Sequence, residues 1–321
     1  SNAQPIPVDQ SKERILFVDN GDGSITTTVE ISYVGDPDAF SWIVPVPETP
    51  TLGVTPPMAL QVLDLATTPV IIPRADWSEG IPGDDDDSAG DDDDAGGGGG
   101  VIVEDLDQVG PYDPEVLTAT DATTLVNWLN THGYVVTEAM TPFMQDYIDA
   151  GMKFLAMKLA PDAGASDITP IEMTYNAANP MVPIILTSVA AAPDMEIIVF
   201  IAGSTRFEST TYTNLLVDTA RVHADPRTGT NNYFPLLSWQ SDEAGGHAAF
   251  TEYANTTSHL LDRASLAADR IVDGLDGWDY LDDLLPSAGM VTRLYIRLSN
   301  TEMTADPAFG PAATNDTVSN I

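Results

Sequence analysis

The side chains best suited to chemistry gather around His247. Gly245-Gly246 precedes this histidine, Glu243 lies before the glycine pair and Glu252 follows. A histidine beside carboxylates can ligate a metal or act as a general base, and a glycine pair lets another group approach the backbone closely. The structural alternative is a helix end followed by a strand, in which His247 makes a local hydrogen bond.

A second group of candidate ligands lies in the run GDDDDSAGDDDDAGGGGG at residues 83–100. Its aspartates are Asp84, Asp85, Asp86, Asp87, Asp91, Asp92, Asp93 and Asp94. Calcium prefers oxygen ligands, so the run predicts weak, exchangeable Ca²⁺ binding, although a fixed cage would also need carbonyl ligands. The alternative is a solvated acidic loop without specific metal binding. Because no side chain here is both apolar and larger than alanine, we expect a loop inserted into a folded domain.

Established catalytic motifs are missing from the sequence. It has no Gly-x-Ser-x-Gly elbow, no His-Glu-x-x-His and no Walker phosphate loop. The lack of cysteine excludes disulfides, thiolate catalysis and cysteine-ligated zinc. A hydrolase that uses carboxylates stays open, because a pair of them suffices for glycosidase chemistry and the chain has 49 acidic residues.

The charge balance narrows the class of partner. The 321-residue chain has 12 basic residues against those 49 acids, and its formal net charge is −37. Such a surface gains nothing from releasing the counterions of nucleic acid, and it is repelled by anionic membranes. Self-repulsion at this charge is relieved by salt or divalent cations. We therefore expect no nucleic-acid partner and a surface suited to a salty medium.

The most apolar stretch, residues 181–204, is expected to form the centre of the fold. It is long enough to raise the question of a membrane span, but proline and charge interrupt it. The interrupting residues are Pro183, Pro193, Asp194 and Glu196. We expect two central strands instead, near 182–189 and 196–201, because nearly continuous β-branched runs are typical of strands covered on both faces.

Periodicity and turn residues predict the elements around this centre. Further strands are expected at 13–18, 24–34, 40–46, 70–72, 101–107, 112–119, 152–159, 171–175, 249–253 and 290–299, and helices at 56–67, 122–132, 141–151, 231–243 and 258–273. Asp121 and Gly133 are the expected boundaries of the second helix. Pro45 and Pro47 mark the strand at 40–46 as an edge strand or as ending there. Strands and helices are mixed without strict alternation, which predicts an α+β fold with mixed, mostly antiparallel sheets and packed helices.

The expected organisation is one domain. Residues 1–3, Ser-Asn-Ala, are typical of an expression-tag remnant. Residues 4–309 are expected to form a single α+β domain that carries the acidic loop at 83–100. Residues 310–321 have the polar, turn-forming composition of a C-terminal tail.

Several segments together resemble one bacterial family. They include PVDQSKERILF (7–17), DAFSWIVPVP (38–47), ATDATTLVNWLNTHGY (119–134), GMKFLAMKL (151–159), PMVPIILTSVAAAPDMEIIVFIAG (180–203), DEAGGHAAFTEYA (242–254) and MVTRLYIRLSNTEMTADPAF (290–309). The family is the bacterial domain of unknown function 2330. The resemblance implies a secreted or envelope-attached protein, outside the cytoplasm, and brings no established activity or catalytic residue with it.

Two hypotheses about function follow. The first is a non-enzymatic binding or structural module of the bacterial envelope, whose partner is an envelope protein or a cell-surface ligand and whose acidic loop binds divalent cations weakly. The second is a carboxylate-based hydrolase with a site near His247, Glu243 and Glu252. A concave pocket that encloses two buried carboxylates would favour the hydrolase.

Overall fold

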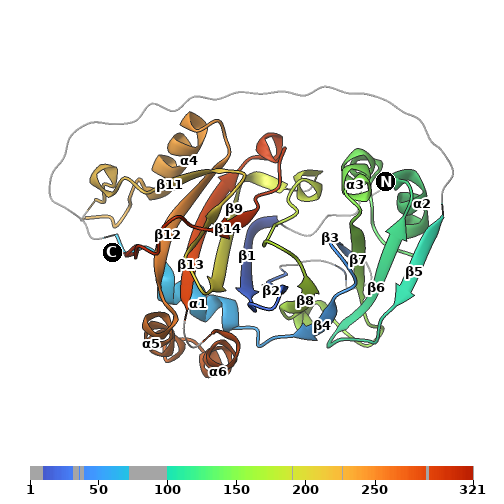
Figure 1. Cartoon of the computed structure of the whole chain (residues 1–321), viewed down its shortest axis with the longest axis horizontal. Helices are drawn as coiled ribbons and strands as arrows, with labels where there is room; N and C mark the ends of the chain where they lie inside the picture. The colour runs from blue at the N-terminus through green and yellow to red at the C-terminus, as the bar shows by residue number, and fades with distance from the viewer. Residues whose placement is uncertain are drawn as a thin grey trace.

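The computed structural model describes residues 10–31, 36, 40–71, 100–189, 191–225, 227–286 and 289–320. Within this part of the chain, a large sheet and a smaller sheet lie side by side, and helices cover the outer face of each (Figure 1). The large sheet is mostly antiparallel, with parallel pairing only of β1 with β9 and of β11 with β12. This arrangement confirms the expected α+β class.

The large sheet has eight strands in the order β11-β12-β13-β9-β1-β2-β8-β4. Their bounds are Gln10–Asp19 (β1), Ser24–Val29 (β2), Thr51–Val54 (β4), Ile171–Asn176 (β8), Ala191–Gly203 (β9), Thr213–Leu216 (β11), Ala248–Thr256 (β12) and Met290–Leu298 (β13). Strands β9, β13 and β1 are at its centre. Their side chains alternate between two apolar clusters, one on each face of the sheet.

Four helices belong to the outer face of the large sheet. They are α1 (Ala59–Thr67), α4 (Tyr233–Glu243), α5 (Thr257–Ala268) and α6 (Gly274–Leu284). Helices α1, α5 and α6 pack against one another, and Figure 1 shows them together at one end of the molecule. Apolar side chains of all four helices join the cluster that covers this face, so the helices bury the sheet from solvent.

The small sheet has the order β3-β7-β6-β5, with all pairs antiparallel. Its strands are Trp42–Val46 (β3), Val101–Asp105 (β5), Tyr112–Ala119 (β6) and Lys153–Leu159 (β7), and its helices are α2 (Ala122–Thr131) and α3 (Thr141–Asp149). The Asp121 carboxylate caps α2 by accepting a hydrogen bond from the Thr124 amide at 2.8 Å. Strand β3 lies at the edge, as its prolines predict, because proline cannot donate to a ladder.

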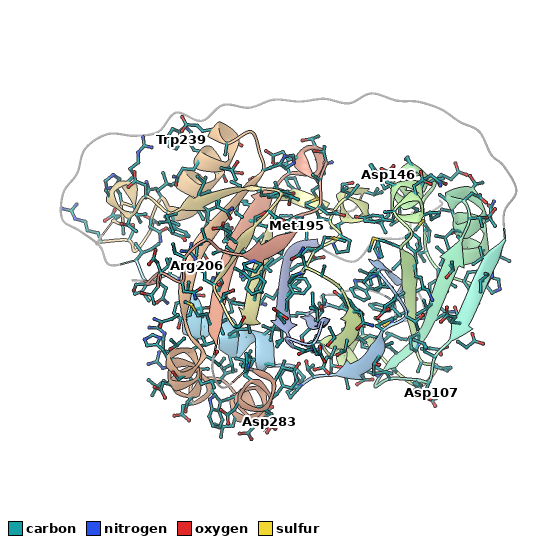
Figure 2. The ribbon with its side chains drawn as sticks, viewed as in Figure 1. Asp107, Asp146, Met195, Arg206, Trp239 and Asp283 are labelled. Atoms are coloured by element: carbon teal, nitrogen blue, oxygen red, sulfur yellow. The ribbon has the colours of Figure 1, made fainter. Side chains whose placement is uncertain are left out.

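Side chains sort by polarity between the interior and the rim. Met195, on β9, is fully buried near the middle of the molecule in Figure 2. Asp107, Asp146 and Asp283 are exposed and lie at the rim of the same view. The high negative charge is thus carried largely where water and ions can screen it.

The expected strand at 182–189 is wrong. Of the two expected central strands only β9 is present, and residues Leu186–Val189 form a short 3₁₀ helix. Val182, Ile184 and Leu186 are nevertheless buried. The apolar run therefore indicates burial and not conformation, since a short buried segment has the same composition whether it is extended or turned. Pro183 also deprives the segment of one backbone donor that a ladder would use.

Several boundaries also differ from those expected. Helix α1 begins at Ala59, three residues after the expected start at Pro56, and the buried Thr55 hydroxyl has no hydrogen-bond partner among the described residues. No strand occurs at Val70 and Ile71, the described part of the run at 70–72. Helix α6 was not predicted at all, because the run at 258–273 is followed by aspartates and glycines that have low helix propensity.

The C-terminal segment is built into the fold. Phe309–Pro311 forms strand β14, which pairs with β10 (Phe207–Ser209). Further along, Val318 makes a bridge with Ala254, and Asn320 donates a hydrogen bond to the Thr68 carbonyl at 2.8 Å. The polar composition that suggested a tail is thus compatible with packing, since its amides and carbonyls find partners.

Candidate binding site

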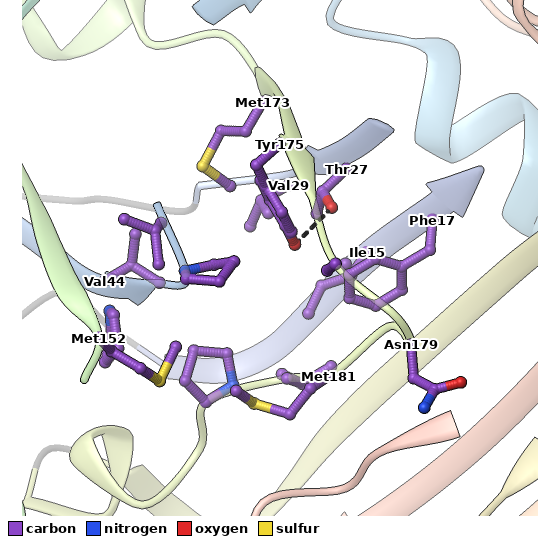
Figure 3. Close-up of a pocket in the computed structure, with 16 residues that line it drawn as sticks. Ile15, Phe17, Thr27, Val29, Val44, Met152, Met173, Tyr175, Asn179 and Met181 are labelled. Carbon is purple, nitrogen blue, oxygen red and sulfur yellow. Dashed lines mark hydrogen bonds between the residues drawn. The ribbon is translucent and has the colours of Figure 1, made fainter. Parts of the chain in front are cut away.

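A cavity of about 120 Å³ lies between the inner face of the large sheet and strand β3 of the small sheet. Figure 3 shows the side chains that surround it. They are Ile15, Phe17, Thr27, Val29, Val44, Pro45, Val46, Pro47, Met152, Met173, Tyr175, Ala177, Asn179, Met181, Val182 and Pro183. None of these residues carries a charge. The cavity is therefore an apolar site of the kind that holds small ligands.

Strand alternation explains why β1 presents apolar groups to the cavity. Ile15 and Phe17 point to the inner face, while Leu16 and Val18 join the cluster under the helices. On β2, Ile25 and Val29 join the inner cluster and Thr27 lines the cavity, so alternate residues of this strand share the inner face. The inner wall is thus a direct product of period-two patterning in two paired strands.

The opposite wall comes from the edge of the small sheet and from a loop. Val44 packs on the inner cluster, and its neighbour Ile43 points the other way, toward the core under α2 and α3. Met152, Met173 and Met181 add flexible thioether side chains from three separate parts of the chain. Methionine adapts its shape to a ligand at little cost, so these walls suit an apolar guest.

A partly buried pair of hydroxyls lies at the cavity wall. The Thr27 and Tyr175 hydroxyl oxygens are 2.9 Å apart and share a hydrogen bond (Figure 3). Thr27 is 3 % exposed. Burial raises the pKa of Tyr175, and the bond to Thr27 opposes this only in part, so the phenol stays neutral.

The other face of the large sheet holds a group of charged side chains, of which Asp64, Glu252 and Arg293 are buried, and we call it the Asp64 cluster. It consists of Lys12, Arg14, Glu30, Asp64, Glu252 and Arg293. The Asp64 carboxylate accepts hydrogen bonds from Arg293 Nη1 at 2.6 Å and from Arg14 Nε at 2.8 Å. The Glu252 carboxylate accepts from Arg293 Nε at 2.6 Å and from the Tyr233 hydroxyl at 2.5 Å.

The charged groups of the Asp64 cluster are paired with one another, which makes Asp64 unsuited to general acid–base catalysis. Burial would raise the pKa of Asp64, but the charges of Arg293, Arg14 and Lys12 outweigh it and lower this pKa to about 2. A carboxyl that is ionised at all ordinary pH values cannot donate a proton, and both its oxygens already have partners. The cluster fixes α1 to the sheet and offers no site for a reacting group.

His247 makes the local contacts of the structural alternative. Its Nε2 donates a hydrogen bond to the Glu302 carbonyl at 2.7 Å and lies 3.2 Å from the Thr304 hydroxyl. The imidazole also packs on Tyr212, with ring centres 4.9 Å apart. A Cβ on Gly246 would lie 2.8 Å from a Glu302 side-chain oxygen, so this glycine is needed for close approach.

The carboxylates proposed to act with His247 are not gathered around it. Glu243 is exposed at the last residue of α4. Glu252 lies in the Asp64 cluster, where Arg293 and Tyr233 occupy its oxygens. Within the described residues no hydrogen bond or ion pair joins either side chain to His247, and no three histidine or acidic side chains are arranged to hold a metal. Asp84–Asp94, the predicted calcium ligands, lie outside the described residues.

Sequence reasoning missed both the cavity and the Asp64 cluster. A signal for the cluster was present: Arg293 and Arg297 interrupt the otherwise apolar strand MVTRLYIRLS. An arginine on the covered face of a central strand requires buried acids as partners. The cavity had no comparable signal, because its lining residues are ordinary core residues drawn from segments distant in the chain.

The fold and the cavity define an α+β protein with an apolar site between its large sheet and its small sheet. The chain belongs to the family described as an uncharacterized protein conserved in bacteria, domain of unknown function 2330, whose model matches residues 1–310. No curated protein and no solved structure matches the chain. In the described part, no helix is both long and apolar enough to cross a bilayer.

Proposed function

We propose that this protein is a non-enzymatic binding module of the bacterial envelope that takes a small apolar ligand in the cavity between its two sheets. The observation that carries the proposal is the cavity itself, with uncharged walls built from both sheets. A concave, mostly apolar cavity with a few polar groups at its wall is the usual kind of place for a small ligand. A dry, apolar cavity of about 150 Å³ in another protein accepts benzene, so this one is of the right size for a single ring or a short chain.

The position of the cavity suits reversible binding. Its lining includes Asn179, which is exposed, so part of the wall is in contact with solvent. Deeper in, Phe17 and Val46 are buried, and their side chains belong to the inner apolar cluster. A ligand would therefore enter from water and exchange its hydration for apolar contact. Burial of apolar surface stabilises such a complex by roughly 25 cal/mol per Å².

Toluene is a suitable probe. The methyl groups of Met152, Met173 and Met181 line the cavity, and their NMR signals should shift and saturate as toluene is added. Met144 is buried in the cluster under α2 and α3, so its signal serves as an internal reference. If toluene leaves the three signals unchanged up to its solubility limit, the cavity is not a binding site.

A filled cavity supplies the matched control. Val44→Phe places a ring in the cavity and is expected to abolish the shifts at all three methionines, whereas Ile43→Phe, on the opposite face of β3, should retain them. Thermal unfolding of both variants shows whether each is folded. Equal binding of toluene to both variants would contradict the proposed location.

The envelope location is what the family resemblance implies, and the charge of the chain is compatible with it. A net charge of −37 suits a compartment in which salt and divalent cations screen the surface. Immunoblotting of cytoplasmic, periplasmic and surface fractions from a bacterium that expresses its native gene tests this. Recovery only with a cytoplasmic marker enzyme would contradict it.

Weak cation binding by the eight aspartates of the acidic loop is a separate part of the proposal. Calcium titrated into the protein should give a small heat with exchangeable, low-affinity binding. Deletion of residues 83–100 should remove this heat and leave toluene binding unchanged. Equal heats from the full chain and the deletion variant would contradict cation binding by the loop.

A further inference from the structure

We propose that the ligand of this cavity is neutral and carries an oxygen acceptor that receives a hydrogen bond from the Thr27–Tyr175 hydroxyl pair. This inference rests on the proposed function and adds the chemical class of the ligand. It follows from counting donors and acceptors at the cavity wall. Each hydroxyl has one hydrogen to donate and two lone pairs to accept with.

The pair at the cavity has one hydrogen in excess. Thr27 and Tyr175 bond only to each other in the described part of the chain, so one O–H hydrogen is used between them and the second has no protein acceptor. Whichever residue donates to the other, the remaining hydrogen belongs to a hydroxyl at the cavity wall (Figure 3). A buried donor without a partner is costly, and a ligand oxygen placed in the cavity would satisfy it.

A similar pair on the opposite face of β2 shows what a completed arrangement looks like. There the Thr28 hydroxyl lies 2.8 Å from the Tyr280 hydroxyl, which in turn donates to Glu172 Oε2 at 2.6 Å. The carboxylate takes the second hydrogen, so every donor is used. Thr27 and Tyr175 lack such an acceptor on the cavity side, which is where a ligand would sit.

The absence of charge in the lining determines that the ligand is neutral. Of the described residues around the cavity, none is acidic, basic or a histidine. A carboxylate or an ammonium group placed against these walls would lose its hydration without gaining a counter-charge. A ketone, ester or ether oxygen needs only the one hydrogen bond that the wall provides. The ligand class is therefore a small hydrocarbon skeleton bearing one such oxygen.

Two probes of nearly equal shape test this inference. Acetophenone carries a carbonyl oxygen where α-methylstyrene carries a methylene group. Replacing both hydroxyls, in Thr27→Val/Tyr175→Phe, should weaken binding of acetophenone about fivefold or more and leave that of α-methylstyrene within about twofold. Each single replacement leaves one hydroxyl whose hydrogen is free to bond to the ligand. Each should therefore weaken the binding of acetophenone less than the double replacement does. Thr28→Val, on the opposite face of the same strand, should change neither affinity.

The outcomes separate the two proposals. If neither probe binds the wild-type protein, the proposed function fails and this inference fails with it. If both bind but the double replacement weakens them equally, the cavity binds apolar ligands and the acceptor is not required. Should the double variant not fold, the infrared band of wild-type-bound acetophenone decides: a carbonyl stretch lowered relative to hydrocarbon solvent supports the hydrogen bond, and an unshifted band overturns it.

Discussion

Arg293 donates a hydrogen bond from Nη1 to Asp64 Oδ1 at 2.6 Å and thereby ties strand β13 to helix α1. The two residues are 229 positions apart in the sequence. Arg293 is 3 % exposed, and its guanidinium also donates to Glu252 at 2.6 Å. The Arg293 guanidinium on the large sheet thus neutralises two buried carboxylates, Asp64 and Glu252, that come from different elements.

Removal of this cation should destabilise the fold strongly. In Arg293→Met the carboxylate of Glu252, which is 4 % exposed, loses its ionic partner and retains only the Tyr233 hydroxyl. Breaking a buried ion pair from one side typically costs about 3 to 5 kcal/mol, because the other charge stays buried. The free energy of unfolding from urea titration measures this loss.

The matched control breaks an ion pair at the surface. Lys153 Nζ lies 2.6 Å from Glu104, whose side chain is 40 % exposed. Lys153→Met should change the free energy of unfolding by less than about 1 kcal/mol, because solvent screens an exposed pair. Similar losses in the two variants would show that the Asp64 cluster has no special weight in stability.

Asp64 should make stability depend on pH in the acid range. Its pKa in the folded protein is about 2, below the ordinary value of 3.8, so the folded state holds the ionised form more strongly than the unfolded chain does. The stabilisation is therefore complete above pH 4 and is lost as the pH falls through 2. The pKa difference corresponds to about 2 kcal/mol. Urea unfolding of wild type and Asp64→Asn at pH 6, 4 and 2.5 should give a difference that narrows toward low pH; a constant difference would contradict this linkage.

The sequence predicted local elements well where one residue type determines a boundary. Asp121 caps α2 as expected, by accepting a hydrogen bond from the Thr124 amide. The prediction failed where tertiary contacts determine the local conformation. Residues 182–189 have a strand-like composition, yet they pack as a turn and a short helix over the inner face.

The site was less predictable than the fold because it depends on pairings between distant segments. Glu252 was expected beside His247, but a register shift between Thr251 and Tyr253 accompanies its placement on the helix-covered face, against Arg293. The cavity requires β3 of one sheet to face β1 and β2 of the other. Period-two patterning predicts which side chains share one face of a strand. It does not predict which other surface that face will pack against.

Gly277 should not tolerate a side chain. A Cβ at this position would lie 2.8 Å from the Ala59 nitrogen and 2.9 Å from the Met58 carbonyl carbon, where α6 crosses the start of α1. Glycine to alanine inside a helix normally stabilises by roughly 0.5 to 1 kcal/mol, so Gly277→Ala should reverse the usual sign and lower the midpoint of thermal unfolding. Asp276→Ala, at the exposed neighbouring position, is the control and should leave the midpoint nearly unchanged. A higher midpoint for Gly277→Ala would mean that the two helices can separate without cost.

The contribution of Glu13 to the free energy of unfolding should depend on pH in the opposite direction from that of Asp64. It lies on the cavity-facing side of β1, two residues before Ile15, and burial raises its pKa from the ordinary 4.5 to about 7. The folded state therefore holds the proton more tightly than the unfolded chain, and the free energy of unfolding should fall as the pH rises from about 4.5 to 7.

The size of this effect is bounded by the pKa difference. The full difference corresponds to at most about 3 kcal/mol, and some remaining solvent contact of the side chain favours the lower part of that range. Glu13→Gln cannot ionise, so its stability should stay level across this interval and exceed that of wild type at pH 8. Glu138→Gln, at an exposed position, should follow the wild-type curve. Parallel curves for wild type and Glu13→Gln between pH 5 and 8 would show that Glu13 ionises in the folded protein as it does in water.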